Sequence, residues 1–386
     1  MSLRVAIAHE WLVRYAGSEH CVREMLELFP DATLLTSVVA PDRLPLELRC
    51  AQPSLLQHIP GARDHHEWLL PFMPVAWRLM AQQRDVDVVV SSSHACAKAV
   101  PIAVGIPHVC YCHTPMRYAW SFDAEQARFP RSLRPLARLG AARFRAWDAR
   151  TAASVTRFLA NSHAVAERIQ RCYGRAAEVV HPPVRTDFFT PGGAREDFFL
   201  FVGRFVAYKR PDLVVEAFAG LPDRLVMVGC GQMESRLRSR ATGNIEFVAD
   251  ADDDRLRDLY RGARALVYPG EEDFGIVMAE AQACGTPVIA LEAGGARDIV
   301  EPGLNGWFLP GQTPAAIRRV VDAVKSEAVN AAEIRRSALR FSAARFRGEL
   351  RAAVEGTVAE AKVSGNAGRA AGARARARDQ DVALPP

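Results

Sequence analysis

The sequence predicts an α/β protein with two domains, each built on a mostly parallel sheet. The chain has 386 residues and is 49% hydrophobic, which is enough to bury two separate cores. Short apolar runs, several of them rich in β-branched residues, alternate with helical segments, and this alternation is typical of right-handed βαβ units. Polar or glycine-containing loops follow these runs, at the strand ends where open α/β sheets bind ligands.

The first half of the chain repeats one plan, in which an apolar strand is followed by a polar turn and then by a helix. The turn after the first strand contains Gly17, an arrangement that is typical of phosphate-binding loops, although a single glycine is a weak signal. Ser162 is a plausible N-cap of a later helix. We expect strands over residues 4–9, 86–91, 108–112 and 158–160, and helices over 19–29 and 164–172.

A second series of strands and helices begins after a stretch rich in proline and glycine, which we expect to connect the domains. The tail is rich in glycine, alanine and arginine and has almost no large apolar residue, so we expect it to be disordered. The expected strands cover 198–202, 224–228, 245–248, 264–269 and 287–291, and the main helices cover 254–263, 314–325 and 331–358. The predicted organisation is an N-terminal domain over 1–183, a C-terminal domain over 197–345, a terminal helix over 346–361 that packs back on the first domain, and a tail over 362–386.

Composition excludes several classes of protein. The eight cysteines are scattered without paired spacing, which argues against a disulfide framework or a zinc site and favours reduced thiols in a cytosolic protein. The first residues read as a core strand and lack the apolar length of a signal peptide. No apolar run reaches the roughly 20 residues of a transmembrane helix. The net charge of +5 is modest but unevenly distributed.

One stretch, residues 272–291, joins a loop, a helix and a strand in a single run. Glu272 lies in the loop after an expected strand, and Glu280 lies a little over two helical turns further on, so the two carboxylates would contact different parts of one extended ligand. We expect this helix to begin near Phe274, and the backbone N–H groups at its start, from Gly275, Ile276 and Val277, suit an anion or a sugar hydroxyl.

Five motifs occur in one order along nearly the whole chain. They are Tyr111-Cys112-His113-Thr114-Pro115, Ala160-Asn161-Ser162, Gly203-Arg204 with Lys209, Glu272 with Glu280, and Gly285-Thr286-Pro287-Val288. Through them the sequence resembles glycosyltransferase family 4. The resemblance implies the GT-B fold, in which two Rossmann-like domains with parallel sheets face each other across a cleft and the second domain holds most of a nucleotide-sugar donor.

The resemblance also implies roles for individual side chains in the second domain. Arg204 and Lys209 would stabilise the negative charge of a nucleotide diphosphate leaving group. Glu280 would accept hydrogen bonds from ribose hydroxyls, and Glu272 would contact sugar hydroxyls together with the N–H groups of residues 275–277. Glu271 remains an alternative to Glu272, although the spacing to Glu280 favours Glu272.

In the first domain the resemblance implies that His113 contacts the sugar or its leaving phosphate and that Gly17 lies near the phosphates. Family members often carry two adjacent glycines there, whereas this chain has Ala16 before Gly17. Asp250 and Asp252 form an Asp-x-Asp pattern of the kind that binds metal in other glycosyltransferases. We interpret these aspartates as caps of the following helix, and we expect a metal-independent enzyme without a cofactor.

A basic segment, residues 128–157, carries many arginines interleaved with leucine, phenylalanine and tryptophan. Such a surface suits an anionic membrane and a lipid-linked acceptor. The alternative, equally compatible with the pattern, is that its apolar stripe packs on the first domain and the arginines are solvated. Nucleic acid is not an expected partner, because aromatic stacking platforms are absent.

These observations predict a cytosolic transferase that moves a sugar from a nucleotide diphosphate sugar to a glycan or polyprenyl-linked acceptor. The family resemblance implies that the transfer retains the anomeric configuration. The run from Cys112 to Trp120 resembles mannosyltransferases of O-antigen and exopolysaccharide assembly, which favours GDP-mannose. The alternatives are a UDP-sugar donor or a non-catalytic nucleotide-sugar binder. A nicotinamide-dependent oxidoreductase is disfavoured, because the Gly-x-Gly-x-x-Gly fingerprint does not follow the first strand.

Overall fold

The computed structural model describes residues 3–120, 132, 134–325 and 327–381, and these residues form two compact α/β units. Unit 1 comprises Met1–Ala160, Ala166–Glu178 and Arg347–Pro386. Unit 2 comprises Asn161–Val165 and Val179–Phe346. The chain therefore leaves and re-enters unit 1 twice, and its last helix, from Arg347 onward, belongs to the unit in which the chain begins.

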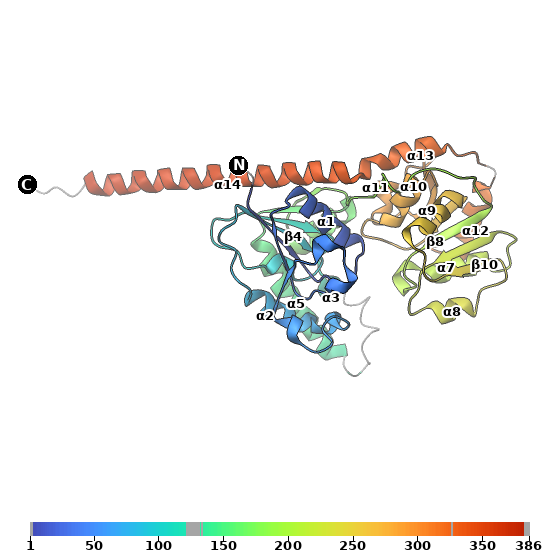
Figure 1. Ribbon diagram of the computed structural model, residues 1–386, viewed down its shortest axis with the longest axis horizontal. Helices are drawn as coiled ribbons and strands as arrows, with labels where there is room; N and C mark the ends of the chain where they lie inside the picture. Colours follow the sequence, from blue (N-terminus) through green and yellow to red (C-terminus); the bar gives the residue numbers. More distant parts are fainter. Residues whose placement is uncertain (1–2, 121–131, 133, 326, 382–386) are drawn as a thin grey trace, which may run out of the picture. The chain divides into compact units, whose positions relative to one another are not determined.

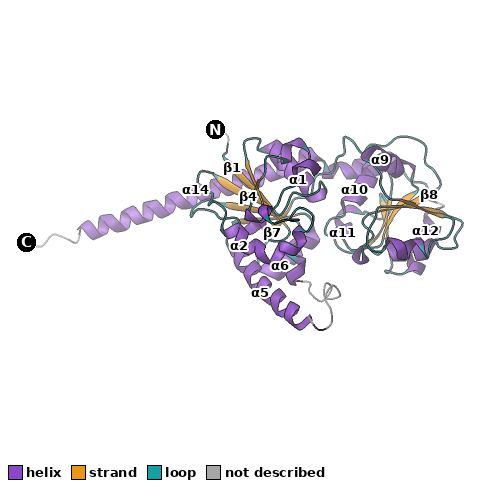
Figure 2. Ribbon diagram, turned by 60° about the horizontal axis from the view of Figure 1, so that its bottom comes forward, coloured by secondary structure: helices purple, strands orange, loops and turns teal. Residues whose placement is uncertain are grey.

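Unit 1 is built on a seven-stranded sheet with the order β3-β2-β1-β4-β5-β6-β7, and helices lie on both sides of its strands (Figures 1 and 2). The strand pairs from β3 to β6 are parallel. The strands are β1 (Val5–His9), β2 (Thr33–Thr36), β3 (Gln52–Pro53), β4 (Val88–Ser93), β5 (His108–Cys112), β6 (Arg157–Ala160) and β7 (Ala177–Val179). The α-helices are α1 (Gly17–Leu28), α2 (Met73–Arg78), α3 (Arg117–Trp120), α5 (Arg134–Ala153) and α6 (His163–Tyr173). The first residues of α6 belong to unit 2.

Unit 2 is built on a six-stranded sheet with the order β10-β9-β8-β11-β12-β13, and all five strand pairs are parallel. The strands are β8 (Phe198–Val202), β9 (Arg224–Val228), β10 (Ile245–Val248), β11 (Ala265–Tyr268), β12 (Val288–Leu291) and β13 (Gly306–Leu309). The α-helices are α7 (Pro211–Phe218), α8 (Glu234–Arg238), α9 (Asp253–Gly262), α10 (Ile276–Ala283), α11 (Ala296–Ile299), α12 (Pro314–Val324) and α13 (Ala331–Ala338).

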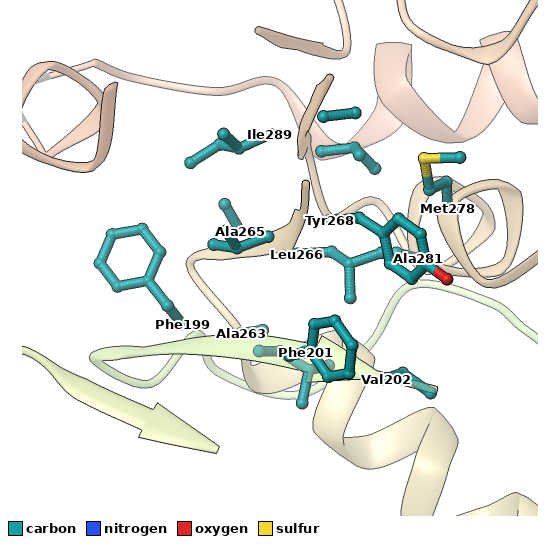
Figure 3. Close-up of a cluster of buried hydrophobic side chains, with 14 of the residues drawn as sticks. Phe199, Phe201, Val202, Ala263, Ala265, Leu266, Tyr268, Met278, Ala281 and Ile289 are labelled. Atoms are coloured by element: carbon teal, nitrogen blue, oxygen red, sulfur yellow. The ribbon is translucent and has the colours of Figure 1, made fainter. Parts of the chain in front are cut away.

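The core of unit 2 follows from the apolar runs in its strands. All residues of β8 and β11 are buried, as expected for parallel strands covered by helices on both faces. Figure 3 shows Phe199 and Phe201 of β8 beside Ala265, Leu266 and Tyr268 of β11, with α10 packed against them. These large buried side chains fix the position of the two strand ends that carry the candidate site.

The predicted α/β fold with two parallel-sheet domains is confirmed, but several boundaries differ. The chain passes from unit 1 to unit 2 between Glu178 and Val179, within the connection expected before residue 197. The rest of that stretch packs on unit 2, because Val184 and Phe189 lie in its core and Arg335 donates to the carbonyls of Thr186 and Phe189. The helix expected over 331–358 is interrupted by a 3-10 turn at Leu339–Phe341.

The last helix, α14 (Ala343–Asp381), packs on unit 1, where Arg347 pairs with Glu24 and Arg157 pairs with Glu360. The disorder expected from residue 362 is not what the structure describes as far as Asp381, where the chain remains helical. Alanine and arginine, which are abundant there, have high helix propensity, and this outweighs the lack of large apolar residues. Residues 382–386 lie outside the described residues.

Within the described part of the chain, no helix combines the length and apolar character needed to cross a bilayer. The cysteines described by the structure form no disulfide.

Candidate functional site

The strongest candidate site of unit 2 lies at the carboxyl ends of β8 and β11. The sheet order reverses at this pair, since β9 lies on the other side of β8 and β12 on the other side of β11. In doubly wound sheets such a reversal leaves a crevice beyond the strand ends, where ligands bind. The loops that leave these two strands carry Arg204, Lys209 and Glu272.

Lys209, Tyr268 and Glu272 meet in one polar cluster. The Lys209 ammonium donates to the Tyr268 hydroxyl at 2.8 Å and forms an ion pair with Oε1 of Glu272, which the Tyr268 hydroxyl also contacts. The Tyr268 ring stacks on Phe201 with ring centroids 5.6 Å apart, so the core holds its hydroxyl in place. Burial and the neighbouring Glu272 carboxylate raise the pKa of Tyr268, which therefore stays protonated and donates.

Arg204 extends this cluster on the β8 side. Its guanidinium donates to the Tyr208 hydroxyl at 3.2 Å, and the Tyr208 ring in turn lies under the Lys209 ammonium, 5.5 Å from its centroid. The predicted pair of cations is therefore connected through one tyrosine. A planar guanidinium beside a compact ammonium that is itself paired with a carboxylate can bind a phosphate and a sugar hydroxyl side by side.

The run from Glu272 into α10 has a shape that depends on glycines. Gly275 precedes the helix in the left-handed region with φ 95°, and a Cβ there would lie 2.0 Å from Cε of Met278. Gly295 packs so closely on the same run that its N–H donates to the Glu272 carbonyl at 2.9 Å. The helix begins at Ile276, two residues later than predicted.

Two other residues predicted for this site have different surroundings. Phe274 is buried in the core of unit 2, with its ring 5.7 Å from His181 and 5.3 Å from Phe341, so its side chain packs instead of facing a ligand. Glu280 accepts from the Tyr260 hydroxyl at 3.0 Å, and burial raises its pKa to about 7. Although pKa shifts of this size often mark functional groups, Glu280 forms no described contact with the Lys209 cluster.

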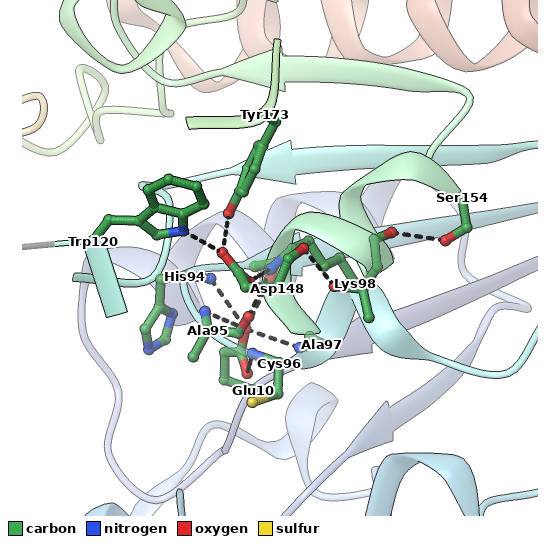
Figure 4. Close-up of polar contacts among 12 residues, drawn as sticks. Glu10, His94, Ala95, Cys96, Ala97, Lys98, Trp120, Asp148, Ser154 and Tyr173 are labelled. Carbon is green, nitrogen blue, oxygen red and sulfur yellow. Dashed lines mark hydrogen bonds and ion pairs between the residues drawn. The ribbon is translucent and has the colours of Figure 1, made fainter. Parts of the chain in front are cut away.

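Unit 1 has its own polar group where its sheet order reverses, between β1 and β4. Glu10, the first residue after β1, is fully buried and accepts hydrogen bonds from the Ser93 hydroxyl and from the four successive backbone N–H groups of residues 94–97, at 2.7–3.1 Å (Figure 4). Burial alone would raise the pKa of Glu10, but His94 and these N–H groups lower it below its usual value. This carboxylate fixes the turn after β4.

His113 follows β5 and belongs to a hydrogen-bonded chain. Its Nε2 lies 2.8 Å from Oγ of Ser92, which lies 3.0 Å from Nδ1 of His9, and Nε2 of His9 lies 3.6 Å from the Glu19 carboxylate. Burial, together with the positive charges that His94 and His9 would carry, holds the pKa of His113 well below its usual value, so the ring is neutral. Ser92 therefore restrains the imidazole, while a neutral ring can exchange hydrogen bonds with hydroxyl groups.

Gly17 is the first residue of α1, and the residue before it is the N-cap. The Ala16 N–H donates to the Glu19 carboxylate at 3.1 Å, and Ser18 donates to the same group at 2.9 Å. The backbone of this loop is thus tied to Glu19, and through Glu19 to His9.

A second buried charge in unit 1 supports the segment after β5. Asp148 of α5 pairs with Lys98 and accepts from Nε1 of Trp120 and from the Tyr173 hydroxyl, both at 2.7 Å (Figure 4). Both ions are almost completely buried, so removing either one would strand the other. The cluster joins α3, α5 and α6.

Groups with metal-ligand chemistry are satisfied in other ways. Asp252 accepts from the Arg255 N–H at 2.8 Å and caps α9, as predicted for the Asp-x-Asp pattern. In unit 2, His163 and His181 each place a ring nitrogen 3.1 Å from the Asp298 carboxylate, a spacing that a metal would accept. The backbone N–H of His163 also donates to Asp298, so this group serves as a cap at the start of α6.

Two family models match consecutive parts of the chain. The model described as Glycosyltransferase Family 4 matches residues 15–188, and the model described as Glycosyl transferases group 1 matches residues 186–340. Together they cover residues 15–340, which include the switch-point site of unit 2 and, in unit 1, β4, β5 and His113. The chain belongs to glycosyltransferase family 4.

Among curated relatives, the family 4 chain is 31% identical over 225 residues to D-inositol 3-phosphate glycosyltransferase 1 of Catenulispora acidiphila, covering 50% of this chain and 54% of the relative. It is 35% identical over 206 residues to D-inositol 3-phosphate glycosyltransferase of Geodermatophilus obscurus, covering 45% of this chain and 46% of the relative. The matches span about half the length of these relatives.

Solved structures share the fold over almost the whole family 4 chain. HepE of Anabaena, in complex with UDP and glucose, aligns with a TM-score of 0.69 at 16% identity over 92% of this chain and 99% of that chain. The apo form of the lipopolysaccharide outer core galactosyltransferase WaaB aligns with a TM-score of 0.63 at 15% identity over 92% and 99%. The GT-B fold implied by the sequence motifs is therefore confirmed.

Several residues around the two candidate sites were not singled out from the sequence. Tyr268 is the last residue of β11, so its place at the carboxyl end of a buried strand was a usable signal. Glu10 likewise follows β1 directly. The link from Glu19 through His9 to Ser92 joins three separate segments, and it emerges only when β1 and β4 pair side by side.

Proposed function

We propose that this protein transfers a hexose from a nucleotide diphosphate sugar to a lipid-linked or growing polysaccharide acceptor. The first hexose to test is mannose, with GDP-mannose as the donor. The observation that carries the proposal is the meeting of Lys209, Tyr268 and Glu272 beside Arg204 at the switch point of unit 2. Family membership and the shared fold support the reaction class.

The cations of this cluster suit the leaving group of such a transfer. As the bond between the sugar and the diphosphate breaks, negative charge grows on the phosphate oxygens, and preorganised cations lower the barrier. We assign this role to Lys209 and Arg204. Because these side chains supply the positive charge, we expect no metal requirement, and dialysis against EDTA should leave the transfer rate unchanged.

The carboxylates are assigned to the hydroxyl groups of the donor. Glu272, held by Lys209 and Tyr268, accepts from sugar hydroxyls together with the N–H groups at the start of α10. Glu280 accepts from the ribose hydroxyls, which it does best when ionised. Its raised pKa of about 7 therefore makes nucleotide affinity depend on pH near neutrality.

His113 is assigned a hydrogen bond to the sugar or its leaving phosphate, because its pKa is too low for a positively charged ring and Ser92 restrains it. The family resemblance carries the stereochemistry. We propose retention, with the acceptor hydroxyl attacking the same face that the phosphate leaves, and with the departing phosphate taking up the proton.

A UDP-sugar donor is the second candidate. HepE of Anabaena, which shares the fold, has been crystallised with UDP-glucose. The base of the nucleotide can be identified directly by calorimetric titration of the protein with GDP, UDP and ADP and then with their sugar conjugates.

The decisive experiment measures release of GDP from GDP-mannose in the presence of a polyprenyl diphosphate-linked glycan acceptor. The proposal predicts acceptor-dependent release and a mannosylated product. Binding of nucleotide sugars without turnover on any acceptor would instead identify a non-catalytic binder. A preference for UDP conjugates would identify a UDP-sugar, in place of GDP-mannose, as the donor.

A further inference from the structure

The helical run formed by the 3-10 helix His66–Phe72 and α2 of unit 1 is apolar on both of its faces. Its inward face includes Met73, Ala76 and Trp77, which are buried in the core cluster of unit 1. The core therefore accounts for only half of the apolar side chains of this run.

The outward face carries four large apolar side chains that the core does not explain. Trp68 is 77% exposed, Phe72 60%, Val75 59% and Leu79 63%. Single exposed apolar residues are ordinary on protein surfaces, but four in twelve residues of one helical run form a patch, and such patches mark interaction sites. A helix that is apolar all round belongs next to a second apolar medium.

Helix α5 lies beside this run and adds positive charge. Phe144 and Trp147 of α5 pack against the same core cluster as Met73 and Trp77, and both ribbon views draw α2 next to α5 (Figures 1 and 2). The first half of α5 exposes Leu136 and Leu139. The arginines of α5 are Arg134, Arg138, Arg143, Arg145 and Arg150.

The acidic residue of α5 does not offset these arginines at the surface. Asp148 has no exposed area and pairs with Lys98 inside unit 1. Near the apolar run, the carboxylate of Asp64 pairs with Arg43 at 2.7 Å, while Glu67 is an exposed acidic residue within the run. Among the described residues of this run and of α5, Glu67 is the exposed acidic residue, and the arginines of α5 outnumber it.

We propose that the outward face of residues 66–79 and the first half of α5 form a docking surface for a lipid bilayer that contains anionic lipids. The aromatic and aliphatic side chains enter the boundary between headgroups and acyl chains, and the arginines bind lipid phosphates. The inference shifts the main apolar contact from residues 128–157, where the sequence pattern suggested it, to a run that the sequence pattern did not single out.

Charge favours a bilayer over a second copy of this chain as the occupant. A symmetric dimer through this face would bring the same patch of each copy together, so the arginines of α5 would meet arginines. An anionic bilayer instead supplies the opposite charge next to an apolar layer. A lipid-linked acceptor as the reason for docking rests on the proposed function. The docking surface itself is inferred from the exposure of its apolar side chains and from its charge.

The test is sedimentation of the full chain with phosphatidylcholine vesicles in which about one third of the lipid is phosphatidylglycerol, compared with pure phosphatidylcholine vesicles. We expect binding to the anionic vesicles that weakens in high salt. The double substitution Phe72→Ser with Leu79→Ser should lower the partition coefficient about tenfold or more, and so should Arg138→Glu with Arg143→Glu.

Matched controls carry equivalent changes elsewhere. Leu304→Ser with Val363→Ser removes two exposed apolar side chains, and Arg236→Glu with Arg240→Glu reverses two exposed charges on unit 2. Both control pairs should bind vesicles within about twofold of the unmodified protein, since they lie outside the docking surface. Unchanged thermal unfolding midpoints and nucleotide titrations of all variants confirm that they are folded.

Failure of the unmodified protein to bind anionic vesicles would overturn the proposal. So would a dimer in analytical ultracentrifugation that Phe72→Ser with Leu79→Ser dissociates. Vesicle binding without any sugar transfer would leave the docking surface standing and overturn the proposed function instead, so the two failures are distinguishable.

Discussion

The two units share the same order over six strands but carry different side chains where their sheet order reverses. In unit 2 the ends of β8 and β11 carry a lysine, an arginine and a carboxylate joined through tyrosines. In unit 1 the ends of β1, β4 and β5 carry histidines and serines, with one buried carboxylate satisfied by backbone N–H groups. The same fold thus provides a charged site suited to a diphosphate and a mostly neutral one suited to hydroxyl groups.

The largest expected effect tests the charged site of unit 2. Replacing Glu272 with alanine removes the carboxylate that Lys209 and Tyr268 hold, and kcat for transfer should fall by about a thousandfold, because a preorganised contact to the reacting sugar is lost. Binding of the free nucleotide should change little, as measured by calorimetry. Glu271→Ala is the matched control and should retain most activity; a reversed result would move the site by one residue.

The next effect tests how the neutral site of unit 1 is held. Glu10→Ala leaves the N–H groups of residues 94–97 without their buried acceptor and should lower the free energy of unfolding by about 2–4 kcal/mol. Urea denaturation provides the measurement. The exposed Glu67→Ala should cost less than about 0.5 kcal/mol. An equal effect of both substitutions would show that Glu10 does not fix this turn.

Ser92→Ala sharpens the comparison by cutting the link between His9 and His113 without removing the imidazole. We expect kcat to fall about tenfold, with nucleotide affinity unchanged, because a misplaced ring loses its contact to the sugar or phosphate. The exposed Ser154→Ala is the control. If Ser92→Ala weakened nucleotide binding as strongly as turnover, the division of roles between the units would be wrong.

The smallest effect is the pH dependence that Glu280 gives to unit 2. Its folded pKa of about 7 lies above its usual 4.5, so the folded state binds the proton more tightly and the contribution of Glu280 to stability falls as the pH rises between these values. Nucleotide affinity should rise severalfold, by roughly a factor of three to ten, between pH 6 and pH 8 as the carboxylate ionises. Glu280→Gln should flatten both profiles; an unchanged slope would remove Glu280 from the ribose contact.

Much of this arrangement was predictable from residue patterns. Buried runs such as 198–202 and 265–268 identify parallel strands, and the order of motifs identifies the family. Lys209 and Glu272, 63 residues apart, were predicted to serve the same donor, but their shared partner Tyr268 was not singled out.

The features that could not be predicted from residue patterns depend on contacts between distant segments or on competing structural preferences of the same residues. Phe274 lies in a run that was predicted to bind a ligand, yet its ring packs against Phe341, a contact between segments far apart in the sequence. The tail after residue 362 has a composition typical of disorder, while its alanines favour a helix. The two faces of α2 are both apolar, so periodicity alone could not say which one the core covers.

The most direct test of the account is calorimetric titration of GDP into the unmodified protein, Lys209→Ala and His113→Ala. If unit 2 holds the nucleotide through its cations, Lys209→Ala should weaken GDP binding by about tenfold or more, whereas His113→Ala should change it by less than about twofold. Wild-type affinity in Lys209→Ala, together with lost affinity in His113→Ala, would contradict the assignment of the nucleotide to unit 2.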